Sequence, residues 1–350
     1  MVRVGLFGIG LDTYWGQFAG LRERLLGYEC RIAERLADSG MEVIDAGLVD
    51  NPDAAQEAAG LFREKRVEGI FLFISTYALS STVLPVAQKT GVPIIILNLQ
   101  PSAAIDYEHF NALGDRGLMT GEWLAHCQAC SVPEIANVFN NARISYDIVT
   151  GYLEEERSWD EIAAWGAAFH TRAVIRDTRV GILGHYYCGM LDVYTDVARL
   201  SAVFGSHFEI LEMDTLAVLR RAVTPEHIAE KRRLFESAFA VSPECEEYEL
   251  DRAAQSACAL SALVAEKGLG AVAYYYEGAA GNEHENIITS VIAGNTLLTA
   301  AHVPVAGECE IKNVMAMKIL DLFGAGGSFS ELYAIDFDED WSPRKVRGKI

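Results

Sequence analysis

The chain has 350 residues, of which 51% are hydrophobic, and its formal net charge at neutral pH is −20. This length and hydrophobic content are typical of a well-buried globular protein with room for two domains. The acidic balance argues against nucleic acid and against anionic membrane surfaces as partners, because both need a basic face. No apolar run reaches the roughly 18 residues of a membrane span, and the sequence opens on a predicted strand without a signal-peptide core, so we expect a cytoplasmic protein.

Residues 1–177 alternate between short apolar runs and amphipathic segments. The apolar runs are typical of buried strands and the segments between them of helices. The expected strands are Val2–Ile9, Glu42–Ala46, Gly69–Ser75 and Val92–Leu99, and the expected helices are Gly16–Ser39, Pro52–Val67 and Thr82–Thr90. Such alternation predicts a parallel sheet wound by right-handed crossovers, which makes this part a Rossmann-like α/β domain.

Polar residues follow the fourth predicted strand, where the simple alternation ends. Gln100 lies at the carboxyl end of that strand, and Asn111 follows at the start of another helix. Both side chains are able to hydrogen-bond a polyhydroxy ligand, and we predict a substrate contact at Gln100. Capping of the loop is the alternative.

Two short motifs in this part resemble redox signatures. Gly8-Ile9-Gly10 follows a strand, but Thr13 replaces the third glycine of a dinucleotide fingerprint, so we reject a dinucleotide site. Cys127-Gln-Ala-Cys130 lies inside Met119–Cys130, which we predict to be helical, and no second CxxC exists to complete a zinc site. We therefore assign this cysteine pair to core packing. Seven scattered cysteines also do not suggest a disulfide framework.

The pattern of the first strand restarts at Thr178. Arg179–Gly184 (RVGILG) repeats Arg3–Gly8 (RVGLFG), so we predict a second Rossmann-like α/β domain over residues 178–327. His185 and Tyr186 follow this strand and are predicted to contact substrate, although a histidine here also suits a structural hydrogen bond. The further strands expected are Phe208–Met213 and Ala271–Tyr276, and the helices are Cys188–Phe204, Pro225–Ala240 and Leu250–Lys267.

Two carboxylates form the main candidate site of this second domain. Glu277 comes directly after the strand Ala271–Tyr276, while Glu308 follows the apolar run Val303–Gly307 and opens a helix expected over Glu308–Phe323. Because the carboxyl ends of parallel strands meet at one edge of a sheet, both carboxylates point into the crevice where such sheets bind ligands. Oxygen ligands of this kind suit Mg²⁺ or Mn²⁺, together with water and a polyol substrate. The alternative is that each glutamate only favours a helix N-terminus electrostatically.

One more cluster of potential ligands and the C-terminal part of the chain remain. Asn282–Glu285 (NEHE) is dense in potential ligands and is a secondary candidate, because helix capping explains it equally well. Gly324–Ser328 is expected to be a flexible loop, followed by a strand over Phe329–Phe337. The chain then closes on a basic stretch, residues 341–350, without apolar periodicity.

Several of these segments resemble the L-arabinose and L-fucose isomerase superfamily. Ala306–Lys312 (AGECEIK) is similar to the AGEGDWK of arabinose isomerases, and Glu277 fits the family's first metal-binding glutamate. Weaker similarities to TSFMEDYTYHF and to the segment after the family's fourth strand are found at Ser328–Glu331 with Tyr333–Phe337, and at Leu99-Gln100, Phe110-Asn111 and Gly121-Glu122. The resemblance covers most of the chain, and no motif is matched letter for letter.

The resemblance implies a metal-dependent aldose–ketose isomerase acting on a small sugar. In this family two acidic residues and at least one histidine hold Mn²⁺, and a proton moves between C1 and C2 of the open-chain sugar through an enediol. Carried over, Glu277 and Glu308 are the metal ligands and the acid/base residues, and Lys312 of the AGECEIK motif joins Gln100, His185 and Tyr186 as a sugar contact. Mg²⁺ or Co²⁺ is able to replace Mn²⁺. The family also implies a homo-oligomer.

The sequence departs from the family in two respects. Asp336 stands where arabinose isomerases have a histidine, and the β-rich C-terminal domain that supplies their remaining metal-binding histidine has no counterpart. We therefore interpret residues 328–350 as the start of a truncated C-terminal segment, which would leave the metal site without one wall and one ligand.

Two α/β domains around a cleft also describe non-catalytic sugar-binding proteins, and this alternative stays open. A binding module needs no metal, so Glu277→Gln should leave its sugar affinity nearly unchanged. An isomerase should lose metal binding and turnover together.

Overall fold

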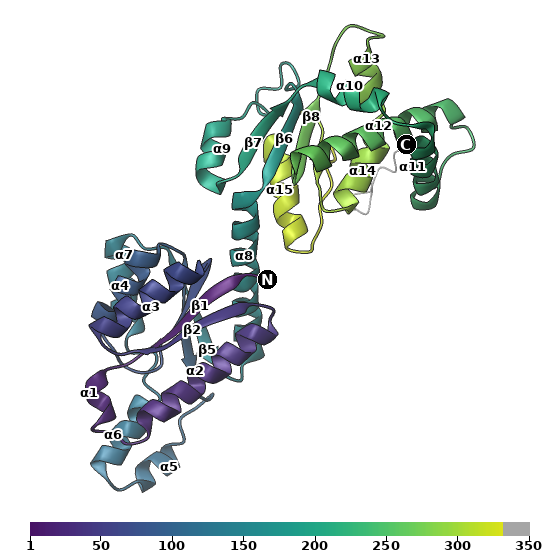
Figure 1. The fold of residues 1–350 in the computed structure, drawn as a ribbon. Helices are drawn as coiled ribbons and strands as arrows, with labels where there is room; N and C mark the ends of the chain where they lie inside the picture. The colour runs from purple at the N-terminus through teal and green to yellow at the C-terminus, as the bar shows by residue number, and fades with distance from the viewer. Residues whose placement is uncertain (332–350) are drawn as a thin grey trace, which may run out of the picture. The chain divides into compact units, whose positions relative to one another are not determined.

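The computed structural model describes residues 1–331 and shows an α/β protein with two purely parallel sheets (Figure 1). The chain divides into two compact units, the first covering Met1–Val174 and the second beginning at Ile175. The predicted fold class is therefore confirmed. The strand expected to end at Phe337, the residue Asp336 and the basic stretch 341–350 lie outside the described residues.

The first unit is built on a five-stranded parallel sheet with the strand order β2-β1-β3-β4-β5. Its strands are β1 (Arg3–Ile9), β2 (Glu42–Val49), β3 (Gly69–Phe73), β4 (Ile94–Gln100) and β5 (Tyr146–Tyr152). Its helices are α1 (Asp12–Trp15), α2 (Leu21–Asp38), α3 (Pro52–Lys65), α4 (Ser80–Thr90), α5 (Tyr107–Ala112), α6 (Arg116–Leu124), α7 (Val132–Ala142) and α8 (Glu156–Asp177), the last of which continues into the second unit.

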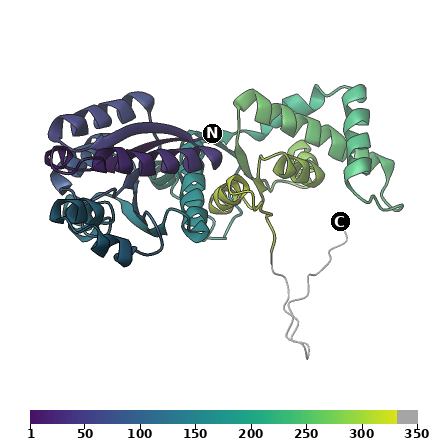
Figure 2. The same cartoon turned by 90° about the horizontal axis from the view of Figure 1, so that it is seen from below.

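Helices cover both faces of this sheet, which is why its central strands are apolar almost throughout. One core lies between the sheet and α3, α4 and α7, with Phe62, Val83 and Phe139 at its centre. The other lies between the opposite face and α2 and α8, where Leu36 and Phe169 pack against the strands. In both views the strands of the unit lie between these helices (Figures 1 and 2).

The second unit is built on a four-stranded parallel sheet with the order β7-β6-β8-β9. Its strands are β6 (Arg179–Gly184), β7 (His207–Leu211), β8 (Ala271–Tyr275) and the two-residue β9 (Val305–Ala306). Its helices are α9 (Val197–Phe204), α10 (Met213–Arg221), α11 (Pro225–Ala238), α12 (Glu247–Lys267), α13 (Glu283–Ile288), α14 (Ile292–Ala300) and α15 (Ile311–Leu322). Leu216 of α10 and Leu263 of α12 pack on one face, while Val314 of α15 packs on the other.

The internal repeat seen in the sequence has a structural counterpart. The two RVG strands, β1 and β6, occupy the same place in their sheets, each between the second and third strands of its unit. The arginine of each motif also pairs with a glutamate of the neighbouring strand, Arg3 with Glu42 at 2.9 Å and Arg179 with Glu209 at 3.2 Å. Each unit therefore has its topological switch point between equivalent strands, and this is where doubly wound sheets bind ligands.

Several predicted boundaries were wrong, and two of them have local physical reasons. The first long helix begins at Leu21 and not at Gly16, because Gly20 adopts a left-handed φ of 79° that breaks the helix. The predicted helix Met119–Cys130 ends at Leu124, and the Gln128 side chain donates to the carbonyl of Ala125 (2.8 Å) beyond it. The predicted helix Cys188–Phe204 begins only at Val197, so residues 185–196 form a loop. The elements α1, α7, β5, α8, α10 and α14 were not predicted.

Within residues 1–331, no helix combines the length and the apolar character that a membrane span needs.

A buried carboxyl group lies beside the central strand of the first unit. Glu29 of α2 is 1% exposed, and its Oε1 accepts a hydrogen bond from the main-chain nitrogen of Gly8 at 2.6 Å. Its side chain also lies beside the carboxyl group of Asp45, and the two are able to share a hydrogen bond only when one of them carries a proton. Burial, followed by the nearby charge of Asp45, raises the pKa of Glu29 to about 8.

This carboxyl group makes the stability of the first unit depend on pH. Because the pKa of Glu29 is raised in the folded state, its contribution is complete below its ordinary pKa of 4.5 and is lost as the pH rises through about 8. Each pKa unit corresponds to about 1.4 kcal/mol, so the loss amounts to several kcal/mol. In Glu29→Gln, which keeps the shape without the titration, this loss should disappear.

Urea unfolding at about pH 5 and about pH 8.5 tests this expectation. Tryptophan fluorescence reports on the first unit, because four of the five tryptophans belong to it, namely Trp15, Trp123, Trp159 and Trp165. An equal loss of stability in the wild type and in Glu29→Gln would contradict a titrating Glu29.

Candidate functional site

The candidate site lies at the carboxyl edge of the second sheet, around the switch point between β6 and β8. Gly184 ends β6 opposite Tyr275, which ends β8. The main-chain nitrogen of His185 donates to the carbonyl of Tyr275 at 3.0 Å, so the pairing of the two strands extends one step into the loop. Gly184 has a left-handed φ of 83°, and a Cβ there would come within 2.1 Å of the Tyr275 carbonyl oxygen. This close approach requires glycine at position 184.

His185 positions the main chain that carries Glu277. Its Nδ1 lies 2.9 Å from the carbonyl oxygen of Tyr186, and its Nε2 lies 3.3 Å from both the main-chain nitrogen and the carbonyl oxygen of Glu277. The neutral tautomer with a proton on Nδ1 satisfies the short contact and lets Nε2 accept from the Glu277 nitrogen. Main-chain groups thus lie within hydrogen-bond range of both ring nitrogens, which favours the structural role considered above over direct sugar binding.

Tyr275 lies beside the first of the two predicted carboxylates. Its hydroxyl group donates to Oε2 of Glu277 at 3.1 Å. Partial burial, the hydrogen bond and charge of Glu277, and the more distant charges of Tyr187 and Glu308 raise the pKa of Tyr275 to about 12. The negative charges of both glutamates therefore raise the pKa of the Tyr275 hydroxyl group. Sequence reasoning missed this residue, although three consecutive tyrosines at Tyr274–Tyr276 at the end of a buried strand were a usable signal.

Glu308 lies in a strained turn between β9 and α15. Glu308 and Cys309 both have left-handed backbone angles, with φ of 55° and 58°. Such a conformation costs about 1–2 kcal/mol for a residue with a Cβ, and it persists only where the surroundings impose it. Here the buried Cys309 donates its main-chain N–H to the carbonyl of Tyr274 (3.0 Å), and Tyr187 donates to the carbonyl of Glu308 (3.3 Å).

This turn corrects the predicted start of the last helix. Glu308 was expected to open it, but α15 begins at Ile311, and its N-cap is Glu310, whose side chain accepts from the nitrogen of Lys312 at 3.2 Å. Electrostatic support of a helix N-terminus therefore belongs to Glu310. Glu277 likewise caps no helix, because α13 begins at Glu283 behind its own N-cap, Asn282.

Negative charge is crowded around Glu308. Partial burial, followed by a shared hydrogen bond with Glu331 and the charges of Asp192 and Glu310, raises the pKa of Glu308. Lys312 lies at the rim of this group, 3.9 Å from Oε1 of Glu310, and donates to the carbonyl oxygen of Asp192. It is half-exposed, with 49% of its side chain accessible.

The donor set at this edge has the chemistry that a hard divalent cation prefers. Glu277 and Glu308 supply carboxylate oxygens. The repulsion between Glu308 and the acidic side chains around it is of the kind that a bound cation offsets. Among residues 1–331, however, no group of three or more His, Cys, Asp or Glu side chains is arranged to hold a metal. A cation here would therefore depend on two protein carboxylates and on oxygens from water or substrate.

The other predicted site residues lie in different surroundings. Gln100 ends β4 in the first unit, beside Tyr152 of β5 and with its carbonyl accepting from Leu153 at 2.9 Å. The hydroxyl group of Tyr186 donates to the carbonyl of Thr195 at 3.3 Å, and its ring packs against Tyr194. The secondary candidates of α13 have structural partners: Glu283 pairs with Arg221 (2.6 Å), His284 with Asp214 (3.0 Å), and Glu285 accepts from Gly281 (2.6 Å).

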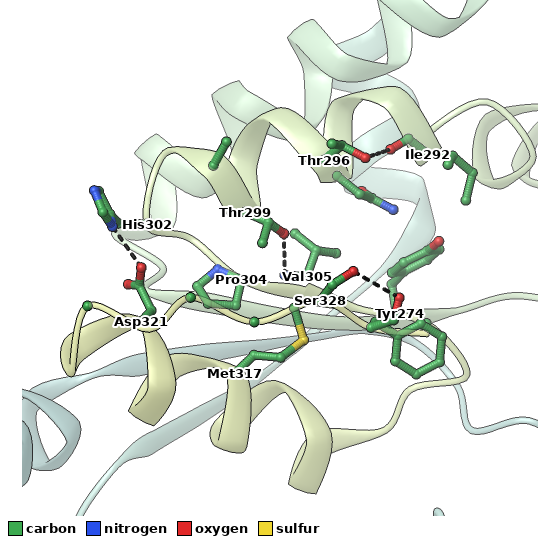
Figure 3. A pocket seen from close by; sticks show the side chains of 17 residues that line it. Tyr274, Ile292, Thr296, Thr299, His302, Pro304, Val305, Met317, Asp321 and Ser328 are labelled. Carbon is green, nitrogen blue, oxygen red and sulfur yellow. Dashed lines mark hydrogen bonds and ion pairs between the residues drawn. The ribbon is translucent and has the colours of Figure 1, made fainter. Parts of the chain in front are cut away.

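A cavity of about 540 Å³ lies beside β9, between residues of α14 and α15 (Figure 3). Thr299 of α14 and Val305 of β9 face it and are joined by a hydrogen bond of 3.2 Å from the Val305 nitrogen. Neither Glu277 nor Glu308 lines it. The two predicted carboxylates therefore do not belong to this cavity.

No protein-family model and no curated protein matches this sequence. Two solved structures are similar over most of the chain. One is a CobK precorrin-6A reductase, with 12% identity, 88% of this chain and 87% of that chain covered, and a TM-score of 0.21. The other is a periplasmic solute-binding protein of an ABC transporter from Actinobacillus succinogenes with bound D-allose, with 11% identity, coverage of 95% and 96%, and a TM-score of 0.20. Scores this low support no inference about chemistry.

The strained turn yields a prediction about stability. Glu308→Gly should be more stable than Glu308→Ala by about 1 kcal/mol, because only glycine adopts the left-handed φ without cost. Both variants remove the carboxylate, so the difference between them isolates the backbone strain. Urea unfolding followed by circular dichroism measures it, and equal stability of the two variants would show that the turn is not strained.

Proposed function

We propose that this chain is a metal-dependent aldose–ketose isomerase of a small sugar, related to the L-arabinose and L-fucose isomerases. The observation that carries the proposal is that Glu277 and Glu308 follow the neighbouring strands β8 and β9 at one edge of the sheet, where the Tyr275 hydroxyl group donates to Glu277 at 3.1 Å. Two carboxylates at the carboxyl ends of neighbouring strands suit an acid/base reaction on adjacent carbon atoms.

Glu277 is the better placed of the two glutamates to move a proton. It is exposed, and its Oε2 accepts from Tyr275 while its main chain is fixed by His185. We assign to Glu277 the transfer of a proton between C1 and C2 of an open-chain sugar, and to Tyr275 the orientation of that carboxylate. Glu308, with its raised pKa, is able to hold or release the second proton.

A divalent cation such as Mn²⁺, Mg²⁺ or Co²⁺ would be held by Glu277 and Glu308. When bound, such a cation polarises a carbonyl oxygen and stabilises the negative charge that develops on it. The chain's own residues orient the sugar, and Lys312 at the rim is suited to donate to a sugar hydroxyl group.

The proposal also includes the cellular compartment and the oligomeric state. All seven cysteines are free, which is typical of a reducing compartment, so we place the protein in the cytoplasm. The resemblance to the isomerases supports a homo-oligomer.

Isomerisation in D₂O with Mn²⁺ and either L-arabinose or L-fucose tests the proposal. The expected result is formation of the ketose with deuterium at the carbon that receives the proton. Glu277→Gln should lose this activity at least ~100-fold, because a positioned general base contributes 10²–10⁴ to such reactions. Glu283→Gln, which removes a carboxylate paired with Arg221 outside the site, is the matched control and should retain the activity.

Sugar binding measured on the same proteins distinguishes the isomerase from a non-catalytic sugar-binding protein. Binding that is independent of metal, unchanged in Glu277→Gln and unaccompanied by deuterium incorporation would contradict the isomerase and support a sugar-binding protein.

A further inference from the structure

The Cys127-Gln-Ala-Cys130 motif lies outside the helix in which the sequence analysis placed it. Because α6 ends at Leu124 and α7 begins at Val132, the motif lies in the connection between two helices and not within one. Cys127 is 6% exposed, whereas Cys130 is exposed. Core packing therefore accounts for Cys127 but not for Cys130, and that part of the sequence interpretation was wrong.

Two buried side chains hold this connection in place. Gln128 donates to the carbonyls of Ser75 (2.9 Å) and Ala125 (2.8 Å), and it is 0% exposed. The hydroxyl group of Ser131 lies 3.0 Å from the nitrogen and 3.1 Å from the carbonyl oxygen of Ala78. Both anchors lead to the segment that follows β3, so the motif is fixed beside the switch point of the first sheet.

The two thiols are neighbours within this fixed connection. Burial, followed by the neighbouring Cys130 thiol, raises the pKa of the Cys127 thiol to about 12, so the two side chains lie close enough to interact. Two cysteines separated by two residues, outside any helix or strand, are able to reach the Cα distance of a disulfide. An exposed thiol that is able to attack, next to a buried thiol that is able to resolve, is the arrangement of dithiol redox sites.

We propose that Cys127 and Cys130 form a reversible dithiol–disulfide site, which is independent of the carboxylate site in the second unit. The Cys130 thiolate attacks one sulfur of a small-molecule disulfide, such as glutathione disulfide, and releases one thiolate. The Cys127 thiol then loses its proton and attacks the sulfur of Cys130 in this mixed disulfide, which releases the second thiolate. Two protein thiols are oxidised to one disulfide, two protons leave, and the small disulfide is reduced to two thiols.

Peptide mapping after treatment with glutathione disulfide tests the proposal. Cleavage by trypsin after Arg116 and Arg143 gives a peptide that holds Cys127 and Cys130 and no other cysteine. After oxidation, quenching and alkylation under denaturing conditions, this peptide should carry neither alkyl groups nor glutathione, and reduction should restore two alkylation sites. Cys188, exposed and separated from other cysteines in the sequence, is the internal control and should keep a glutathione adduct.

Two variants assign the roles of the cysteines, with circular dichroism confirming that each is folded. In Cys127→Ala the adduct on Cys130 should persist, because the resolving thiol is gone. In Cys130→Ala the buried Cys127 should remain unmodified until the protein is denatured. A persistent glutathione adduct on Cys130 of the wild type, or full alkylation of both cysteines after oxidation, would overturn the proposal.

Discussion

The parallel pairing of β6 with β8 determines where the second unit is able to bind a ligand. Backbone hydrogen bonding continues past the last strand residues, since His185 donates to the Tyr275 carbonyl. The two chains then separate, with β7 on the outer side of β6 and β9 on the outer side of β8. This separation creates the edge where Tyr275, Glu277 and the Glu308 turn meet. His185 depends on the same pairing, because its ring nitrogens reach the main chain of Glu277 only if both strands end in register.

The Glu308 turn suggests that the site is maintained at some cost in stability. Two consecutive residues with a Cβ adopt left-handed angles, and a partly buried carboxyl group lies among other acidic side chains. The burial of Cys309 and its hydrogen bond to Tyr274 offset this strain by tying the turn to β8. Features that destabilise a fold locally and are held by their surroundings are common where a ligand or a reaction uses them. The first unit has a comparable feature in the buried Glu29, whose raised pKa has no role in the proposed reaction.

Much of the fold could be predicted from the sequence, because buried parallel strands are continuous apolar runs and can be recognised from the sequence alone. The carboxyl-end positions of Glu277 and Glu308 followed from those strands. The sequence did not reveal contacts between distant segments. Residues 188–196 were predicted to be helical but form a loop, in which the Tyr194 hydroxyl group accepts from the nitrogen of Gly189 and Lys312 donates to the carbonyl of Asp192. The left-handed turn at Glu308 was equally hidden, since no glycine marks it. The same limit applied to Cys130, whose exposure depends on Gln128 reaching Ser75 across the fold.

The most direct test of a single cation site shared by Glu277 and Glu308 is a calorimetric double-mutant cycle with Mn²⁺. The proteins are the wild type, Glu277→Gln, Glu308→Gln and the double variant. We predict saturable binding by the wild type, a loss of at least ~10-fold in affinity in each single variant, and little further loss in the double variant, because both carboxylates act on one ion. Strictly additive losses, or wild-type affinity in either single variant, would contradict a shared site.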